Sequence, residues 1–258
     1  MKCNQLFYKK QSFEQSGRAF QGISSFTLHI IAMLLMLCDH LWATVLSQYA
    51  WLTWVGRIAY PIFAFMLVEG YFYTHHLKRY LGRLFLGAIL SELPFNLMYA
   101  GSPFYPFHQN VLWTFLIALL SITFIEKAKR SGKWWAAILT VIIGCLLGTI
   151  GMVDYLGAGV LTVLGFYFFH GKKWWCYIGQ LVCMVIININ LLGGYYYAVS
   201  IAGHEIQVIQ QGFAILALIP IWLYNGRQGY HSKVFQYFCY GFYPAHLLIL
   251  YFIWQCMV

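Results

Sequence analysis

Charged residues are scarce in this chain of 258 residues, where Asp, Glu, Lys and Arg together make up 9% of the sequence. A soluble globular domain usually contains about 25% of them. Apolar residues account for 61% of the chain and aromatic residues for 20%. The scarcity of charge therefore argues against an ordinary soluble domain and predicts an all-α polytopic membrane protein.

Acidic residues are the rarer of the two signs, with 7 Asp and Glu against 16 Lys and Arg, which gives a net charge of +9. In a soluble protein this excess would suggest nucleic acid as a partner. Here the cations lie between apolar runs, where they set the orientation of a membrane protein. We therefore expect the lipid bilayer, and no nucleic acid, as a partner.

Cysteine pairs and processing signals are also lacking. The seven cysteines form no Cys-x-x-Cys motif and lie mostly inside apolar runs, so neither a disulfide framework nor a thiolate metal site is predicted. The N-terminal stretch has no compact apolar core followed by a small-residue cleavage site. No repeat or linker is visible. We expect residues 1–25 to form a cytoplasmic N-terminal segment and residues 26–258 a single transmembrane domain.

Apolar runs of about 20 residues are long enough to cross a bilayer as helices. Charged, Gly, Pro and Asn positions divide the chain into about nine such runs, or about eight to ten if a weak run is merged or split. The stretch from Tyr195 to Glu205 is open to three interpretations: a loop, a re-entrant piece or part of a shifted span. The predicted spans are Phe26–Leu46, Leu52–Thr74, Leu81–Tyr99, Asn110–Ile125, Trp134–Met152, Leu156–Phe169, Trp174–Leu192, Ile206–Tyr224 and Val234–Trp254.

The positions of Lys and Arg predict the orientation. With the N-terminus in the cytoplasm, every cation except Arg57 falls on the cytoplasmic side. Lys and Arg are enriched in cytoplasmic loops of membrane proteins. We therefore predict a cytoplasmic N-terminus and, after nine spans, a C-terminus on the outer side.

Polar side chains within the apolar runs are the candidates for function, because an ionisable group costs about 3 kcal/mol at bilayer depth. Their positions along the predicted spans bring segments that are far apart in the sequence to one level, in the outer half of the membrane. The polar residues at this level are Asp39, His40, Arg57, Asn96, His108, Gln109, Asn110, Asp154, Tyr155, Tyr243 and His246.

Two of these positions have distinct chemical roles to consider. Arg57 needs a partner, which Asp39 or Asp154 can supply as a desolvated pair, and a purely structural ion pair is an equal alternative. His40 is the stronger candidate for chemistry, since an imidazole accepts and passes on a proton near neutral pH. A hydrogen-bonded core histidine is the alternative, and His246 is the alternative base.

A cytoplasmic loop gathers the other polar group, with Glu69, His75, His76, Lys78, Arg79 and Arg83. One interpretation is a solvated loop that only follows the orientation rule. The other is a phosphate-binding mouth, because Arg and Lys side chains suit a multiply charged donor. No metal site is predicted, because the histidines form no i, i+4 pair with a third ligand nearby.

Several ordered motifs resemble the signatures of the TraX family, which are integral-membrane proteins named for a conjugal-transfer protein that acetylates the N-terminus of pilin. The resemblance extends from about Leu28 to Leu248. The motifs are Cys38-Asp-His-Leu41, Val55-Gly-Arg-Ile-Ala-Tyr-Pro-Ile-Phe-Ala-Phe-Met-Leu-Val-Glu-Gly-Tyr71, Arg79-Tyr-Leu-Gly-Arg-Leu84, Glu92-Leu-Pro-Phe-Asn96, Gln109-Asn110, Asp154-Tyr155 and Phe242-Tyr-Pro-Ala-His-Leu247.

The TraX family is similar to a larger group of transmembrane acyltransferases, so the resemblance implies that residues 26–258 are an acyltransferase-like domain of a bacterial cytoplasmic membrane. It implies an acyl-CoA donor, such as acetyl-CoA, that enters from the cytoplasm, a buried histidine at the reaction centre, and an acceptor on the outer side or within the membrane. The implied catalytic residues are Asp39, His40, Arg57, Asn96, Asn110, Asp154, Tyr243 and His246. The cationic cytoplasmic loop supplies the candidates for binding the CoA phosphates, which are His75, Lys78, Arg79 and Arg83.

We therefore expect transfer of an acetyl or short acyl group from acyl-CoA to an amine or hydroxyl at the outer half of the membrane. His40 would be the general base or a transient acyl carrier, and Asp39 would orient it or hold Arg57. Asn96, Asn110 or Tyr243 would stabilise the oxyanion. The acceptor stays open among a small molecule, a glycan, a lipid and a peptide N-terminus, and a homodimer stays open as well.

Two other classes of protein compete with this interpretation. In a transporter or permease, Asp39, His40 and Arg57 would form a proton or substrate relay. The absence of an evident inverted repeat in the sequence counts against it. A non-catalytic scaffold or sensor would leave the convergence of polar residues unexplained.

Overall fold

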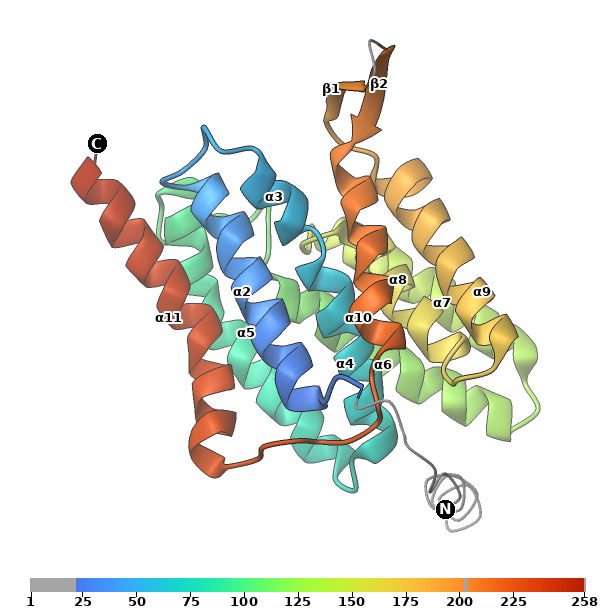
Figure 1. Ribbon diagram of the computed structural model, residues 1–258. Helices are drawn as coiled ribbons and strands as arrows, with labels where there is room; N and C mark the ends of the chain where they lie inside the picture. The colour runs from blue at the N-terminus through green and yellow to red at the C-terminus, as the bar shows by residue number, and fades with distance from the viewer. Residues whose placement is uncertain (1–21, 202–203, 258) are drawn as a thin grey trace.

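The computed structural model describes residues 22–201 and 204–257 as a bundle of helices with one short β-hairpin (Figure 1). Strands β1 (Tyr196–Ile201) and β2 (His204–Ile209) pair antiparallel. The helices are α2 (Ser25–Ala43), α3 (Trp51–Gly56), α4 (Ala59–Tyr73), α5 (Leu77–Ala100), α6 (Val111–Arg130), α7 (Trp134–Ile150), α8 (Leu156–Phe168), α9 (Trp174–Val185), the π-helix η1 (Ile186–Leu192), the 3₁₀ helix η2 (Gln210–Ala217), α10 (Leu218–Trp222) and α11 (Lys233–Met257).

The long apolar helices confirm an all-α membrane protein. Within the described ranges, six helical segments are long and apolar enough to cross a membrane, and two of them join adjacent helices, α3 with α4 and α9 with η1. The segments are Ser25–Ala43, Trp51–Tyr73, Leu77–Ala100, Val111–Arg130, Trp174–Leu192 and Lys233–Met257. Three further apolar helices are shorter, at Trp134–Ile150, Leu156–Phe168 and Gln210–Trp222. The number of nine spans therefore stays a prediction.

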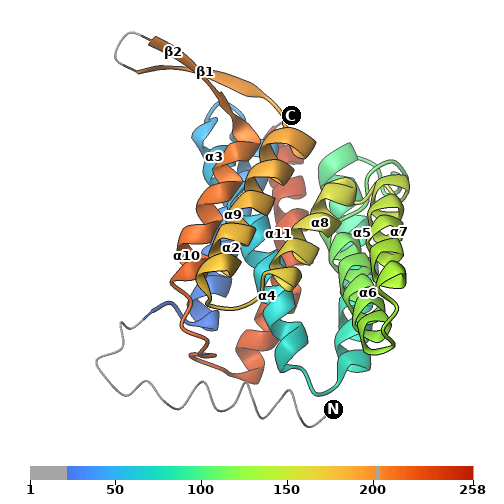
Figure 2. The same ribbon diagram turned by 90° about the vertical axis from the view of Figure 1, so that its right-hand side faces the viewer.

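The bundle has two chemically different ends. We call the outer end the one that carries α3, the hairpin and the last turns of α11, and the inner end the one where α2 and α11 begin (Figures 1 and 2). Among the residues that the structure describes, Arg57 is the one Lys or Arg toward the outer end. Lys2, Lys9, Lys10 and Arg18 of the predicted N-terminal segment lie outside the described residues.

The hairpin corrects one predicted boundary. The expected span Ile206–Tyr224 does not begin as a helix, since Ile206 to Ile209 belong to strand β2 and the helix starts at Gln210. Tyr197 pairs with Val208, and Tyr196 with Ile209. Aromatic and β-branched residues favour such cross-strand pairs over a helix. Of the three interpretations of the stretch from Tyr195 to Glu205, the loop is nearest to this hairpin.

The predicted span Leu52–Thr74 consists of two helices, α3 and α4, with a short interruption at Arg57 and Ile58. Pro61 lies in the first turn of α4, where its missing amide would have no helical partner in any case. The interruption thus lies beside Arg57, the cation expected at the candidate site.

Helix α4 forms the centre of the bundle, surrounded by α2, α6, α8 and α10 (Figures 1 and 2). Its side chains Ile62, Ala64 and Val68 are fully buried, as are Val160 and Val163 of α8. Burial on all sides distinguishes α4 from the peripheral helices, whose outward apolar faces suit contact with lipid.

Gly159 in α8 permits the close approach of α8 to α4 and α6. A Cβ at this position would lie 2.8 Å from Cγ2 of Thr114 and from Cβ of Tyr155, and 2.9 Å from the hydroxyl oxygen of Tyr60. We expect Gly159→Ala to lower the free energy of unfolding by about 1–3 kcal/mol through overpacking. Thermal unfolding in detergent measures the change. Gly82→Ala is the matched control, because a Cβ there meets nothing within 4 Å. Equal unfolding temperatures for the two variants would contradict this packing.

Candidate functional site

Two histidines from opposite ends of the chain meet in the outer half of the bundle. Nδ1 of His40, in α2, lies 2.6 Å from Nε2 of His246, in α11. His246 is 5% exposed, and its Nδ1 lies 2.7 Å from the carbonyl oxygen of Phe242, one helical turn earlier. The ring of Tyr243 lies beside the pair, with centroids 6.4 Å from His40 and 5.8 Å from His246. The structure therefore brings together three of the predicted site residues.

Asp39 is held by a short chain of polar contacts. Its Oδ1 accepts a hydrogen bond of 2.7 Å from the hydroxyl of Thr53, and that hydroxyl oxygen accepts one of 2.7 Å from Nε2 of Gln210. Its Oδ2 lies 3.7 Å from Nη1 of Arg57. Of the two predicted partners of Arg57, the structure thus places Asp39 in an ion pair, and Asp154 is near enough to act on it electrostatically.

Gly56, which has no side chain, allows α3 to pack closely against Asp39 of α2. A Cβ at Gly56 would lie 2.8 Å from Cα and from Oδ1 of Asp39. The last turn of α3 therefore packs directly on the backbone of α2, which brings Thr53 and Arg57 to the carboxylate.

A strained loop holds Asp154 and Tyr155 between α7 and α8. Met152, Tyr155 and Leu156 have positive φ angles of 49°, 61° and 52°, which non-glycine residues adopt at a cost of about 1–3 kcal/mol each. The loop is fixed to the segment before α6, because the amide of Gln109 donates to the carbonyl of Met152 at 2.9 Å and the amide of Asp154 donates to the carbonyl of Gln109 at 2.9 Å. Such strain is typical of functional sites.

Both polar residues of this loop point to neighbours at the outer end. Oδ1 of Asp154 lies 3.4 Å from Nε2 of His108, and the side chain of Tyr155 contacts the guanidinium of Arg57. Tyr155 also stacks on Tyr60 at a centroid distance of 4.1 Å. Burial raises the pKa of the Tyr155 phenol well above its ordinary value, so this group stays neutral.

Asn110 lies in a second polar group rather than against the histidines. It caps α6 by accepting a hydrogen bond of 3.1 Å from the amide of Leu112, and it donates to the carbonyl of Ala88 at 2.9 Å and to the carboxylate of Glu92. The indole of Trp113 donates to the same carboxylate at 2.9 Å. Every hydrogen-bonding atom of the Asn110 side chain is therefore engaged in holding α5 and α6 together.

Asn96 differs from Asn110 because its amide oxygen accepts no hydrogen bond in the described part of the chain. The residue is 2% exposed, and Oδ1 is buried without a hydrogen-bond partner in the described part of the chain. A buried amide oxygen left unpaired costs about 1–3 kcal/mol. Such a group is a candidate for contact with a bound molecule.

The predicted phosphate-binding residues lie at the opposite end. Lys78, Arg79 and Arg83 are exposed in the first two turns of α5, and His75 is exposed just before it. The structure places them at the end of the bundle opposite to the outer polar residues.

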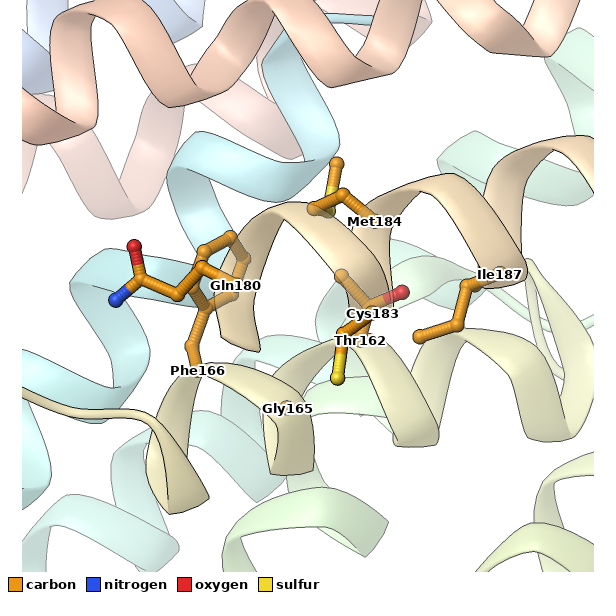
Figure 3. Close-up of a pocket in the computed structure, with 7 residues that line it drawn as sticks. All are labelled: Thr162, Gly165, Phe166, Gln180, Cys183, Met184 and Ile187. Atoms are coloured by element: carbon orange, nitrogen blue, oxygen red, sulfur yellow. The ribbon is translucent and has the colours of Figure 1, made fainter. Parts of the chain in front are cut away.

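A recess in the packing lies between α8 and α9, away from both regions (Figure 3). It is lined mainly by apolar side chains, and its one amide is engaged, since Gln180 donates to the carbonyl of Phe169 at 2.9 Å and accepts from the indole of Trp222 at 2.8 Å. The residues that line it are Thr162, Gly165, Phe166, Gln180, Cys183, Met184 and Ile187. The amide of Gln180 thus serves to hold α9 against its neighbours, and we assign this recess no role in a reaction.

Sequence reasoning missed several residues of these groups. Glu92 meets the same criterion as Asp39, an acid inside an apolar run, yet it entered only as part of a motif. Thr53 and Gln210 carry no such signal, because neutral polar residues are common at helix ends. Toward the inner end, Glu69 of α4 pairs with Nε2 of His170, a contact that joins segments 101 positions apart.

The sequence of this chain is similar to those of TraX proteins and of a probable fimbrial assembly protein. The family model described as TraX protein matches residues 24–254. The chain is 25% identical over 247 residues to the probable fimbrial assembly protein FimC, serogroup H1, of Dichelobacter nodosus, covering 88% of this chain and 94% of that protein. It is 30% identical over 136 residues to Protein TraX of Escherichia coli strain K12, covering 52% of this chain and 51% of that protein. No solved structure matches.

Proposed function

Because this chain belongs to the TraX family, whose model covers residues 24–254, we propose that it is a membrane acyltransferase. The donor is a cytoplasmic acyl-CoA, in particular acetyl-CoA, and the acceptor is an amine or hydroxyl at the outer half of the membrane. The name of the Dichelobacter relative, a probable fimbrial assembly protein, supports a component of surface fibres as one acceptor to test.

The observation that carries the proposal is the His40–His246 pair in the outer polar group. Nδ1 of His40 is engaged by His246, whereas Nε2 of His40 has no protein partner in the described ranges. An imidazole nitrogen that makes no hydrogen bond to the described protein, inside an otherwise apolar bundle, is suited to accept a proton from a bound acceptor.

The reaction assigns His40 two proton transfers. Nε2 of His40 takes the proton of the acceptor N–H or O–H as that atom attacks the thioester carbonyl. The C–S bond then breaks, and the CoA sulfur leaves with the proton from His40. The acyl group ends on the acceptor, and no oxidant or metal is required.

Tyr243 is the donor that we assign to the oxyanion. The unpaired atom of Asn96 is its amide oxygen, which only accepts hydrogen bonds, so it suits an N–H or O–H of a bound molecule and not an oxyanion. The hydroxyl oxygen of Tyr243 is bonded to the backbone of Val111, so its own proton can be donated elsewhere. Asn110, the third candidate from the sequence, is engaged with Leu112, Ala88 and Glu92 and is left out of this role.

The separation of the two ends favours a long donor. Arg79 and Asn96 are 17 positions apart in α5, which is about 25 Å along a helix axis. An acyl-CoA carries its phosphates and its thioester at opposite ends of an extended arm. Its phosphates would contact the inner cations, while its thioester reaches the outer half of the bundle.

We expect Arg79→Ala and Arg83→Ala each to weaken acetyl-CoA binding about 3-fold to 10-fold, because a charge-assisted hydrogen bond to phosphate is lost. The loss should shrink at high salt, which screens exposed charges. Thermal stabilisation of the purified protein by acetyl-CoA measures binding. Lys133→Ala, a cation of a different inner loop, is the control. Unaltered affinity in both Arg variants would return this loop to a purely topological role.

The proposal as a whole is tested with purified protein in lipid vesicles and radiolabelled acetyl-CoA. Label should move to an acceptor fraction of added membranes, and free CoA thiol should appear in equal amount. If acetyl-CoA neither stabilises the protein nor releases its thiol, the acyltransferase proposal fails and the transporter becomes the favoured function.

A further inference from the structure

We propose that His246 is a positioning residue that fixes which nitrogen of His40 carries the proton. This inference rests on the proposed function for its catalytic consequence. Its physical content, the tautomer of His40, follows from the geometry of three groups: the ring of His40, the ring of His246 and the carbonyl of Phe242.

The two imidazole rings meet edge to edge. Their planes are inclined by 14°, their centroids are 4.9 Å apart, and Nδ1 of His40 lies 2.6 Å from Nε2 of His246. The centroid distance exceeds the nitrogen distance by about the two centroid-to-nitrogen radii. Both nitrogens therefore lie on the line between the centroids, in the shared plane, where an N–H bond and a nitrogen lone pair point directly at each other.

The carbonyl of Phe242 sets the direction of this hydrogen bond. A carbonyl oxygen only accepts, so Nδ1 of His246, at 2.7 Å, must carry a proton. In a neutral His246 the other nitrogen, Nε2, is then unprotonated and accepts. The proton between the rings therefore belongs to Nδ1 of His40.

The opposite direction requires an imidazolium. If Nε2 of His246 donated, both of its nitrogens would be protonated and the ring would carry a charge. His246 is 5% exposed, and its chain neighbours Tyr243 and Leu247 belong to a buried apolar cluster with Phe95 and Met98. An unpaired charge is costly in such surroundings.

The consequence falls on the other side of the His40 ring. A neutral imidazole with its proton on Nδ1 has its lone pair on Nε2. Nε2 is also the nitrogen without a protein partner in the described part of the chain. The ring therefore presents an unprotonated nitrogen, which can act as a base, to the molecule that receives the acyl group. His246 thus acts through His40 and does not itself contact the reacting atoms.

The test compares His246→Gln with His246→Leu by ¹⁵N magnetic resonance of histidine-labelled protein in lipid vesicles, with the His40 signals identified by their loss in His40→Ala. The wild type should show a protonated Nδ1 and an unprotonated Nε2 at His40. In His246→Gln the new amide oxygen can replace the accepting nitrogen and should keep this tautomer. The leucine side chain in His246→Leu offers no acceptor, so the tautomers should mix.

Kinetics supplies a second measurement. We expect kcat for acyl transfer to fall about 2-fold to 5-fold in His246→Leu, because a mixture of tautomers leaves only part of the His40 population with its lone pair on Nε2, and KM for acetyl-CoA should be unchanged. His246→Gln should recover most of the loss. A wild-type His40 protonated on Nε2, or an unchanged tautomer in His246→Leu, would overturn the inference even if the protein is an acyltransferase. Absence of transfer in the wild type would instead refute the proposed function and leave the tautomer measurement valid.

Discussion

Replacing His40 by alanine is expected to lower the rate of acyl transfer about 100-fold to 10,000-fold, the usual contribution of a positioned general base. The loss should appear in kcat, because the methyl group of an alanine cannot take the acceptor proton while the inner cations can still hold the donor. Release of CoA thiol from acetyl-CoA by the purified variant in lipid vesicles measures the effect.

The control for His40→Ala is His231→Ala, in the exposed segment before α11. It removes an imidazole far from the outer polar group and should leave the rate unchanged. A folded His40→Ala protein with undiminished turnover would remove His40 from the chemistry. Retained stabilisation by acetyl-CoA would show that such a variant is folded.

Replacing Arg57 by leucine is expected to destabilise the protein by about 3 kcal/mol, because it leaves the carboxylate of Asp39 without its counter-charge. Asp39 and Arg57 have side-chain exposures of 18% and 23%, so water can screen the remaining charge only in part. The unfolding temperature of the purified variant in detergent is the measurement.

A double variant separates charge from packing. Arg57→Leu combined with Asp39→Asn removes both charges, and the new asparagine side chain can still accept the hydrogen bond from Thr53. We expect the double variant to recover most of the stability lost in Arg57→Leu. Asp39→Asn alone completes the comparison. If the stability lost in the double variant equals the sum of the losses in Arg57→Leu and Asp39→Asn, the two side chains are not coupled, and Arg57 stabilises the bundle in another way.

Most of the fold follows from patterns that are local in the sequence. Long apolar runs, the charges between them and the orientation rule predict where the chain turns, and helices α5 and α6 begin within a few residues of the expected positions. The hairpin was missed because Ile206 to Ile209 continue into an apolar run long enough for a membrane span. Hydropathy does not distinguish a strand from a helix in so short a run.

The composition of the candidate site was only partly predictable. Asp39, His40 and Arg57 stand out because charge is expensive in an apolar run. Depth along the predicted spans placed His246 at the level of His40, but no sequence pattern gives the contact between two rings. Asn110 was grouped with them by depth, whereas its side chain turns to Glu92 and the start of α6. Which face of a helix meets which neighbour depends on packing across the whole bundle.

The hydrogen bond between His40 and His246 joins positions 206 residues apart, on the first and the last described helices. During synthesis the N-terminal part of a chain emerges and begins to fold first. His40 is therefore synthesised long before its partner on α11, whereas Thr53 and Arg57, the partners of Asp39, follow within 18 positions. Until α11 has been made, the His40 ring must find another hydrogen-bond partner or remain unpaired. A nascent chain that stops before α11 lacks Tyr243 and His246, so His40 has neither its hydrogen-bond partner nor the neighbouring phenol.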